Sequence, residues 1–99
     1  MAIELKNSLH AAGSIAGATG ARVSGLGFQS TRTGIGVYEL VLDQGVDELE
    51  CQIICTRRGS GTRASFGVLH VSDEVKRISV VGGVGAPFDS SFDFTITRN

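Results

Sequence analysis

The stretch TRTGIGVYELVLDQG, residues 31–45, joins a polar run to an apolar segment through two closely spaced glycines. Gly34 and Gly36 predict a turn or bulge, because glycine accepts positive φ without a Cβ penalty. The segment VYELVL, residues 37–42, then alternates with the period of two that is typical of a β-strand, and residues 43–45 end it with turn chemistry. The stretch therefore predicts a turn followed by a strand.

The two faces of that strand differ. One face carries Tyr38 and two leucines, whereas the other carries Val37, Glu39 and Val41. A face on which two valines flank one carboxylate is only partly polar, so a neighbouring subunit rather than solvent is expected to cover it. We predict a subunit interface at these three residues.

The same period of two recurs along the rest of the chain. LECQIICT, residues 49–56, places Leu49, Ile53 and both cysteines on one face, and FDFTIT, residues 92–97, places its two phenylalanines and its isoleucine inward. Weaker or shorter strands are expected at 26–31, 64–71 and 77–81. Six short strands separated by glycine-bearing turns predict an all-β fold, an antiparallel β-sandwich that is jelly-roll-like or a small barrel, over residues 22–99.

The first part of the chain differs in amino-acid composition from the rest. Residues 1–21 are rich in Ala, Gly and Ser and hold four spaced apolar anchors, which cannot close a core of their own. We predict an extended, partly flexible N-terminal arm that is either a frayed terminus or a segment that orders on a neighbouring molecule, with a short helix over residues 3–12 as a further alternative. The partner-binding residues of such an arm would be Ile3, Leu5, Leu9 and Ile15.

Length and charge narrow the function classes. A chain of 99 residues is expected to form one domain. Its nine basic and ten acidic residues leave no excess positive charge of the kind that binds a phosphate backbone, so no nucleic-acid partner is expected. No run of about 18 apolar residues occurs, so neither a membrane span nor membrane binding is expected. The N-terminal segment lacks the continuous apolar core of a secretory signal. The 41% apolar content is high for so small a monomer and points to self-association.

The sequence predicts no enzyme, no metal site and no cofactor. Cys51 and Cys55 lie about 13 Å apart along one strand, beyond disulfide reach, and are expected to be free and buried in a protein made in a reducing compartment. Neither His10 nor His70 stands beside a second metal ligand or in a nucleophile motif. We therefore expect no catalytic constellation.

Two loops attract attention for other reasons. VVGGVGAPF, residues 80–88, lacks the Lys-Ser/Thr of a phosphate loop, so a flexible connection is the expected reading. RRGSGTR, residues 57–63, is the one basic cluster, with Arg57, Arg58 and Arg63. These arginines either keep an exposed hairpin tip soluble or contact an acidic partner or a polyanionic glycan.

The sequence resembles small β-sandwich modules of tailed-bacteriophage virion proteins. The resemblance lies in the order of its segments: GFQSTRTGIGVYELVLDQG comes first, alternating strands follow, and FDFTITR stands near the C-terminus. Gly34, Gly36 and Tyr38 match the Gly-x-Gly-x-Tyr turn and strand of those modules, over a loose resemblance that covers residues 25–99. Members occur as capsid decoration or cement proteins and as modules of head fibres, tail fibres and spikes. The resemblance implies a homotrimer seated on the capsid or on a fibre axis.

From these observations we expect a decoration protein that is assembled in the host cytoplasm, trimerises, binds the major capsid protein and stabilises the mature head. The alternative is a glycan- or receptor-binding module of a head fibre, tail fibre or spike, which would use the Arg57–Arg63 and Gly82–Phe88 loops. The first hypothesis needs the arm, and the second leaves it dispensable.

Overall fold

The computed structural model describes residues 8–58, 64–83 and 85–98. These residues form antiparallel strands joined by turns and one short 3₁₀ helix, η1 (Glu48–Glu50). The strands are β1 (Ser8–Ile15), β2 (Arg22–Leu26), β3 (Phe28–Gly34), β4 (Val37–Leu42), β5 (Cys51–Arg57), β6 (Ala64–His70), β7 (Val75–Gly82) and β8 (Phe92–Arg98).

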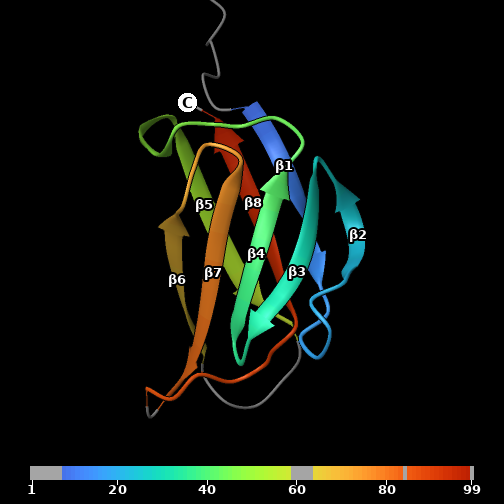
Figure 1. Cartoon of the computed structure of the whole chain (residues 1–99), viewed down its shortest axis with the longest axis vertical. Helices are drawn as coiled ribbons and strands as arrows, with labels where there is room; N and C mark the ends of the chain where they lie inside the picture. Colours follow the sequence, from blue (N-terminus) through green and yellow to red (C-terminus); the bar gives the residue numbers. More distant parts are fainter. Residues whose placement is uncertain (1–7, 59–63, 84, 99) are drawn as a thin grey trace, which may run out of the picture.

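The strands build two four-stranded sheets that lie face to face (Figure 1). Sheet A has the order β2-β1-β8-β5, and sheet B has the order β3-β4-β7-β6. Three hairpins join neighbours within a sheet (β1 with β2, β3 with β4, β6 with β7), and the other connections cross between the sheets. The predicted all-β antiparallel sandwich is confirmed.

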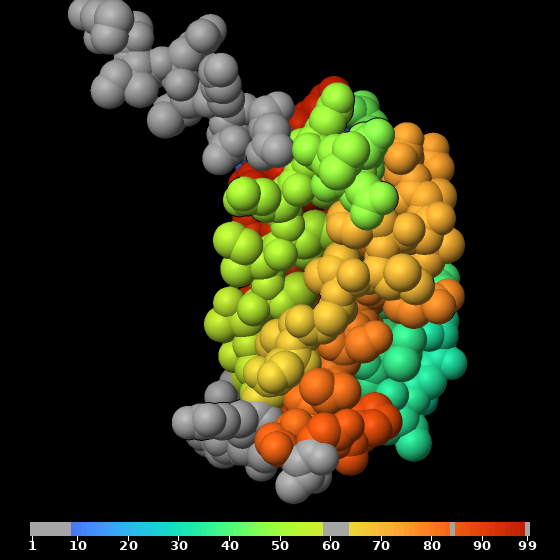
Figure 2. Space-filling model, turned by 90° about the vertical axis from the view of Figure 1, so that its left-hand side faces the viewer, coloured from blue at the N-terminus to red at the C-terminus, as the bar shows by residue number. Residues whose placement is uncertain are grey.

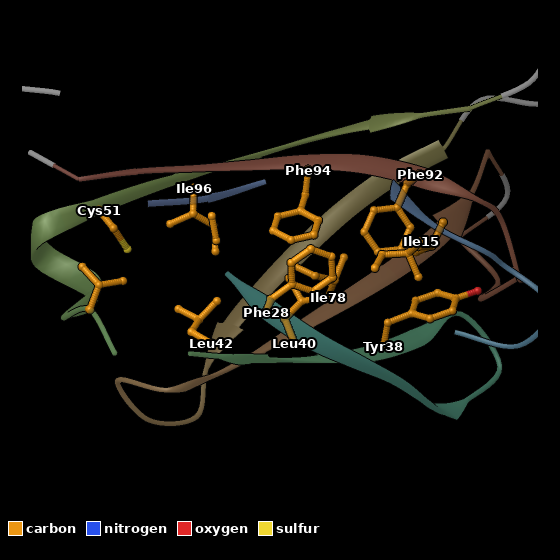
Figure 3. Packing of buried hydrophobic residues seen from close by; sticks show 13 residues of the cluster. Ile15, Phe28, Tyr38, Leu40, Leu42, Cys51, Ile78, Phe92, Phe94 and Ile96 are labelled. Carbon is orange, nitrogen blue, oxygen red and sulfur yellow. The ribbon is translucent and has the colours of Figure 1, made fainter. Parts of the chain in front are cut away.

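The core lies between the sheets and follows the predicted faces (Figure 3). Tyr38 and Leu40 of β4 are fully buried, and so are Phe92 and Ile96 of β8. The rings of Tyr38 and Phe92 pack in the edge-to-face arrangement that aromatic pairs prefer, with their centroids 5.3 Å apart. Alternation along β4 and β8 therefore determined which of their side chains enter the core.

The turn that opens β4 is the predicted one. Ile35 and Gly36 link β3 to β4, and Gly36 has φ of +68°. A Cβ on Gly36 would lie 2.6 Å from the Val80 carbonyl oxygen, so glycine is required by space as well as by φ. The predicted strand 26–31 is wrong in its bounds, because the chain passes from sheet A to sheet B at Gly27, between β2 and β3.

The prediction of an N-terminal arm over residues 1–21 is wrong for residues 8–15, which form β1. β1 lies inside sheet A, paired with β2 on one side and with β8 on the other, and Ile15 is fully buried. Small residues are needed there, because a Cβ on Gly13 would lie 2.5 Å from a ring carbon of Phe28. A register shift between Leu9 and Ala11 also hides the period of two. Residues 1–7 lie outside the described residues.

Leu49 is a second correction. The sequence predicts it inward on the same strand as Cys51, but it lies in η1 and is 85% exposed. Asp47 caps this helix, since its carboxylate accepts a hydrogen bond from the Leu49 amide at 2.9 Å. The strand therefore begins only at Cys51.

Candidate functional site: the outer faces of the sheets

The predicted subunit interface lies on the outer face of sheet B. Val37 and Glu39 are half-buried and Val41 is 42% exposed, so all three point away from the core as expected. The register of β4 and β7 places Glu39 opposite Arg77, and their side chains form an ion pair at 2.8 Å. The centre of this face is therefore charged, a feature that only the pairing with β7 reveals.

The outer face of sheet A has a different character. One cross-strand row runs from Leu26 on β2 through Ala12 and Thr95 to Ile54 on β5. Leu26 and Ile54, at the two ends of the row, are 66% and 60% exposed. The row is uncharged from one edge of the sheet to the other, and it was not predicted from the sequence.

A second row on the same face carries the charge. It holds Ser24, Ser14, Asp93 and Thr56, of which Asp93 is the only charged member. The Asp93 carboxylate accepts a hydrogen bond from the Ser14 hydroxyl and lies 3.5 Å from the Arg58 guanidinium. The charge of Asp93 is therefore balanced within its own chain.

Two of the four predicted arm residues, Leu9 and Ile15, lie in the described part of the chain, both on β1. Leu9 is 60% exposed on the outer face of sheet A, whereas Ile15 is fully buried in the core. Ile3 and Leu5 lie outside the described residues. Of the two arm residues that the structure describes, only Leu9 is therefore exposed at the surface.

Two of the three predicted loop arginines contact their own chain. The Arg57 guanidinium lies 5.6 Å from the centre of the Phe88 ring, and its Nε donates a hydrogen bond to the Ser90 hydroxyl at 3.0 Å. Arg58 pairs with Asp93, as described above. Arg63 lies outside the described residues.

A hydrogen-bond network around Asp89 fixes the connection between β7 and β8. Its carboxylate accepts from Arg32 at 3.0 Å and from the Gly36 amide at 2.8 Å. These hydrogen bonds hold the pKa of Asp89 below its ordinary value, with Arg32 as the larger cause. The Tyr38 hydroxyl donates to the Gly17 carbonyl at 2.7 Å, and burial raises the pKa of its phenol. This network links both sheets at one end of the sandwich.

The histidines and cysteines do not form a shared reactive site in the described part of the chain. His10 Nε2 donates to the Gln44 carbonyl at 2.7 Å beside a hollow of about 300 Å³, and half-buried His70 lies on β6 of the other sheet. Both cysteines are free, and burial raises the pKa of Cys55 to about 11, so its thiol is protonated and a weak nucleophile at neutral pH. Within the described ranges, no three His, Cys, Asp or Glu side chains are grouped as metal ligands. No helix in the described part of the chain is long and apolar enough to cross a membrane.

One buried charge was missed in the sequence. Lys76 is fully buried, and its Nζ donates to the carbonyls of Val46 at 2.7 Å and Ser72 at 2.9 Å. It alternates with Ile78 and Val80 on β7, so the period of two was a signal that could have found it. Lys76 ties the loop after β4 to the turn before β7.

Figure 2 shows the edge of the sandwich at which β5 of sheet A lies beside β6 of sheet B. The outer faces of the two sheets lie on opposite sides of this edge. Comparison of the chain with protein-family models, with curated proteins and with solved structures gives no match.

Proposed function

We propose that this protein is a structural subunit that associates with copies of itself and decorates the head of a bacteriophage. The observation that carries the proposal is the exposure of large aliphatic side chains on the outer faces of regular sheets. Leu9, Leu26 and Ile54 on sheet A and Leu69 on sheet B each expose more than half of their surface. Apolar surface that is exposed on the outer face of a sheet is one mark of a protein-interaction site. The virion context rests on the resemblance of the GIGVY and FDFTITR segments.

The number of copies follows from the shape of the surface. A trimer needs a heterologous contact in which two different surfaces meet, whereas one flat face that meets its own copy gives a two-fold dimer. Leu9, Leu26 and Ile54 share the outer face of sheet A. We therefore propose a dimer as the unit of assembly, in place of the expected homotrimer.

Decoration would work through binding equilibria. A subunit that binds the mature lattice of the major capsid protein, but not its precursor, stabilises the mature head by mass action. Two linked copies raise the effective concentration at the lattice, so a weak contact of each copy becomes a durable attachment.

The test has two parts. Light scattering on a sizing column over a dilution series measures whether the chain associates, and sedimentation with mature and precursor heads of the encoding phage measures decoration. We expect a concentration-dependent increase in mass and co-sedimentation with mature heads only. A chain that stays monomeric at every concentration, or one that associates and binds neither kind of head, contradicts the corresponding half of the proposal.

A deletion that tests the arm hypothesis has to leave β1 in place, because β1 is an internal strand of sheet A. Deleting residues 1–7 removes Ile3 and Leu5 and leaves β1 in place. If these residues bind the capsid, the truncated chain keeps its melting temperature and loses head binding. Saturation of mature heads by the truncated chain would contradict a role for the arm.

The glycan-binding alternative is not carried further. It relies on the basic loop, and there Arg57 contacts Phe88 and Ser90 while Arg58 contacts Asp93. A polyanionic ligand would have to compete with these contacts.

A further inference from the structure

The outer face of sheet A has an approximate internal symmetry. Leu26 and Ile54 occupy the same cross-strand row on the two outermost strands, each one and a half strand spacings from the line between β1 and β8. Both are large aliphatic residues exposed to a similar degree, 66% and 60%. With strands about 4.8 Å apart, the two side chains lie roughly 14 Å from each other.

We propose that this face binds the same face of a second copy around a two-fold axis that runs along the strands, between β1 and β8. This inference rests on the self-association proposed above and names its surface. Rotation about such an axis places β2 of one copy over β5 of the other. Leu26 then lies against Ile54 of the second copy, and Ala12 lies against Thr95. Both Leu26–Ile54 contacts form at once, because the axis makes them equivalent.

The charges on the face are compatible with this arrangement. The same rotation places Asp93 over Ser14 of the second copy, so the two carboxylates do not meet. Each carboxylate already has a hydroxyl and a guanidinium of its own chain as partners. The contact therefore brings no like charges together, and a hydroxyl faces each carboxylate across the interface.

Sheet A suits such a contact better than sheet B does. The centre of the sheet B face is the Glu39–Arg77 ion pair, and both side chains are partly exposed, at 27% and 38%. Covering that pair would remove water from two charged groups, which costs free energy that their attraction only partly returns. The centre of the sheet A face is Ala12 and Thr95, and its ion pair, Asp93 with Arg58, lies toward one end of the sheet, where Arg58 follows the last residue of β5. The centres of protein interfaces are depleted of charge, whereas their rims are polar.

The area of the sheet A face limits the expected affinity of the dimer. Four strands about 4.8 Å apart and roughly seven residues long cover about 19 Å by 24 Å in projection. Two copies then bury about 900 Å² in projection and somewhat more once the relief of the side chains is included. Interfaces near the lower limit of about 1,000–1,200 Å² are weak and transient. We therefore expect a dissociation constant on the order of 10 μM rather than a permanent dimer.

The experiment compares two single variants with the unmodified chain. Ile54→Lys places a charge in the proposed contact, and Leu69→Lys is the matched control. Leu69 is also an outward-facing aliphatic residue on an edge strand, 54% exposed, but it lies on sheet B. Both positions are exposed, so both variants should keep the circular dichroism spectrum and melting temperature of the unmodified chain. Sedimentation equilibrium over about 1–500 μM then gives the dissociation constant of each.

We expect Ile54→Lys to weaken dimerisation by at least about tenfold and Leu69→Lys to leave it unchanged. A double variant tests the axis itself: Leu26→Glu with Ile54→Lys should regain dimerisation, because each new carboxylate then faces a new ammonium of the second copy. The two positions are about 14 Å apart within one chain, too far for an internal ion pair.

The outcomes separate the two proposals. An unmodified chain that stays monomeric overturns self-association and this interface together. An unmodified chain that associates, but is dissociated by Leu69→Lys and not by Ile54→Lys, overturns this interface and supports the sheet B face around Val37, Glu39 and Val41. A stable trimer, or a double variant as weak as Ile54→Lys alone, overturns the two-fold axis and leaves self-association standing.

Discussion

Removal of the Tyr38 hydroxyl is the sharpest test of how the sandwich is held closed. Tyr38 is fully buried at the end of the core, where its ring contacts Phe92 and its hydroxyl reaches the turn after β1. The hydroxyl donates to the Gly17 carbonyl at 2.7 Å and lies 3.3 Å from the Asp89 carboxylate. Tyr38→Phe keeps the ring and removes only these polar contacts.

The expected loss follows from the burial of the acceptor. A hydrogen bond contributes about 0.5–1.5 kcal/mol net, and a buried group that loses its partner costs about 1–3 kcal/mol. Gly17 is buried, and the Asp89 contact is long, so we take the Gly17 hydrogen bond as the main contribution. The free energy of unfolding should fall by about 1–2 kcal/mol. For a domain of this size, that corresponds to a melting temperature lower by about 4–16 °C.

Urea unfolding followed by circular dichroism measures this difference. With a slope of about 1–3 kcal/mol/M, the midpoint should move by about 0.3–2 M while the slope stays constant. Ser65→Ala is the control, since it removes a hydroxyl at an exposed position of β6 and should change stability by less than about 0.5 kcal/mol. The reasoning is refuted if Tyr38→Phe unfolds at the same urea concentration as the unmodified chain.

Three further predictions follow from the core, the Asp89 network and the thiols. Phe94→Ala removes a ring that is 2% exposed and lies 4.7 Å from the Phe28 ring, so it should cost about 3–5 kcal/mol in urea unfolding, and a loss below 1 kcal/mol would contradict the packing described. The pKa of Asp89 is lowered in the folded state, so its stabilising contribution is present above the ordinary carboxyl pKa of about 3.9 and is lost as the pH falls through the folded value. Asp89→Asn should therefore flatten the dependence of the free energy of unfolding on pH between about pH 2 and 5. If the variant loses stability over this range as steeply as the unmodified chain, the Arg32 and Gly36 contacts do not act on this carboxyl. Because burial raises the pKa of Cys55 to about 11, alkylation of Cys55 in the Cys51→Ser variant should be slow at pH 7 and accelerate up to about pH 11. A rate that levels off near pH 8.5, the ordinary thiol value, would contradict the burial of this side chain.

The candidate interaction surfaces were only partly within reach of the sequence. The outward direction of Val37, Glu39 and Val41 was predicted correctly, because it depends on alternation along one strand. The ion pair of Glu39 with Arg77 was not predicted, because the two residues lie 38 positions apart and meet only through the register of β4 with β7. The alignment of Leu26 with Ile54 is a similar case, since it depends on three successive strand pairings.

The N-terminal segment shows where composition misleads. Residues 8–15 hold the alanines and glycine of a flexible arm, yet they form an internal strand between β2 and β8. Small side chains are required there because Phe28 packs closely over Gly13. Local composition cannot distinguish a mobile segment with small side chains from a buried strand whose side chains are small because its neighbours pack closely against it.

The sequence by itself determined the fold class and the inward faces of β4 and β8, because a side-chain period of two is a property of consecutive residues. It also determined the turn at Gly36, where a positive φ favours glycine. Only the tertiary structure decided the strand order, the place of β1 inside sheet A and the carbonyls that accept hydrogen bonds from Lys76. It also decided which outward residues share a face, because each of these depends on pairing between segments that are distant in the chain.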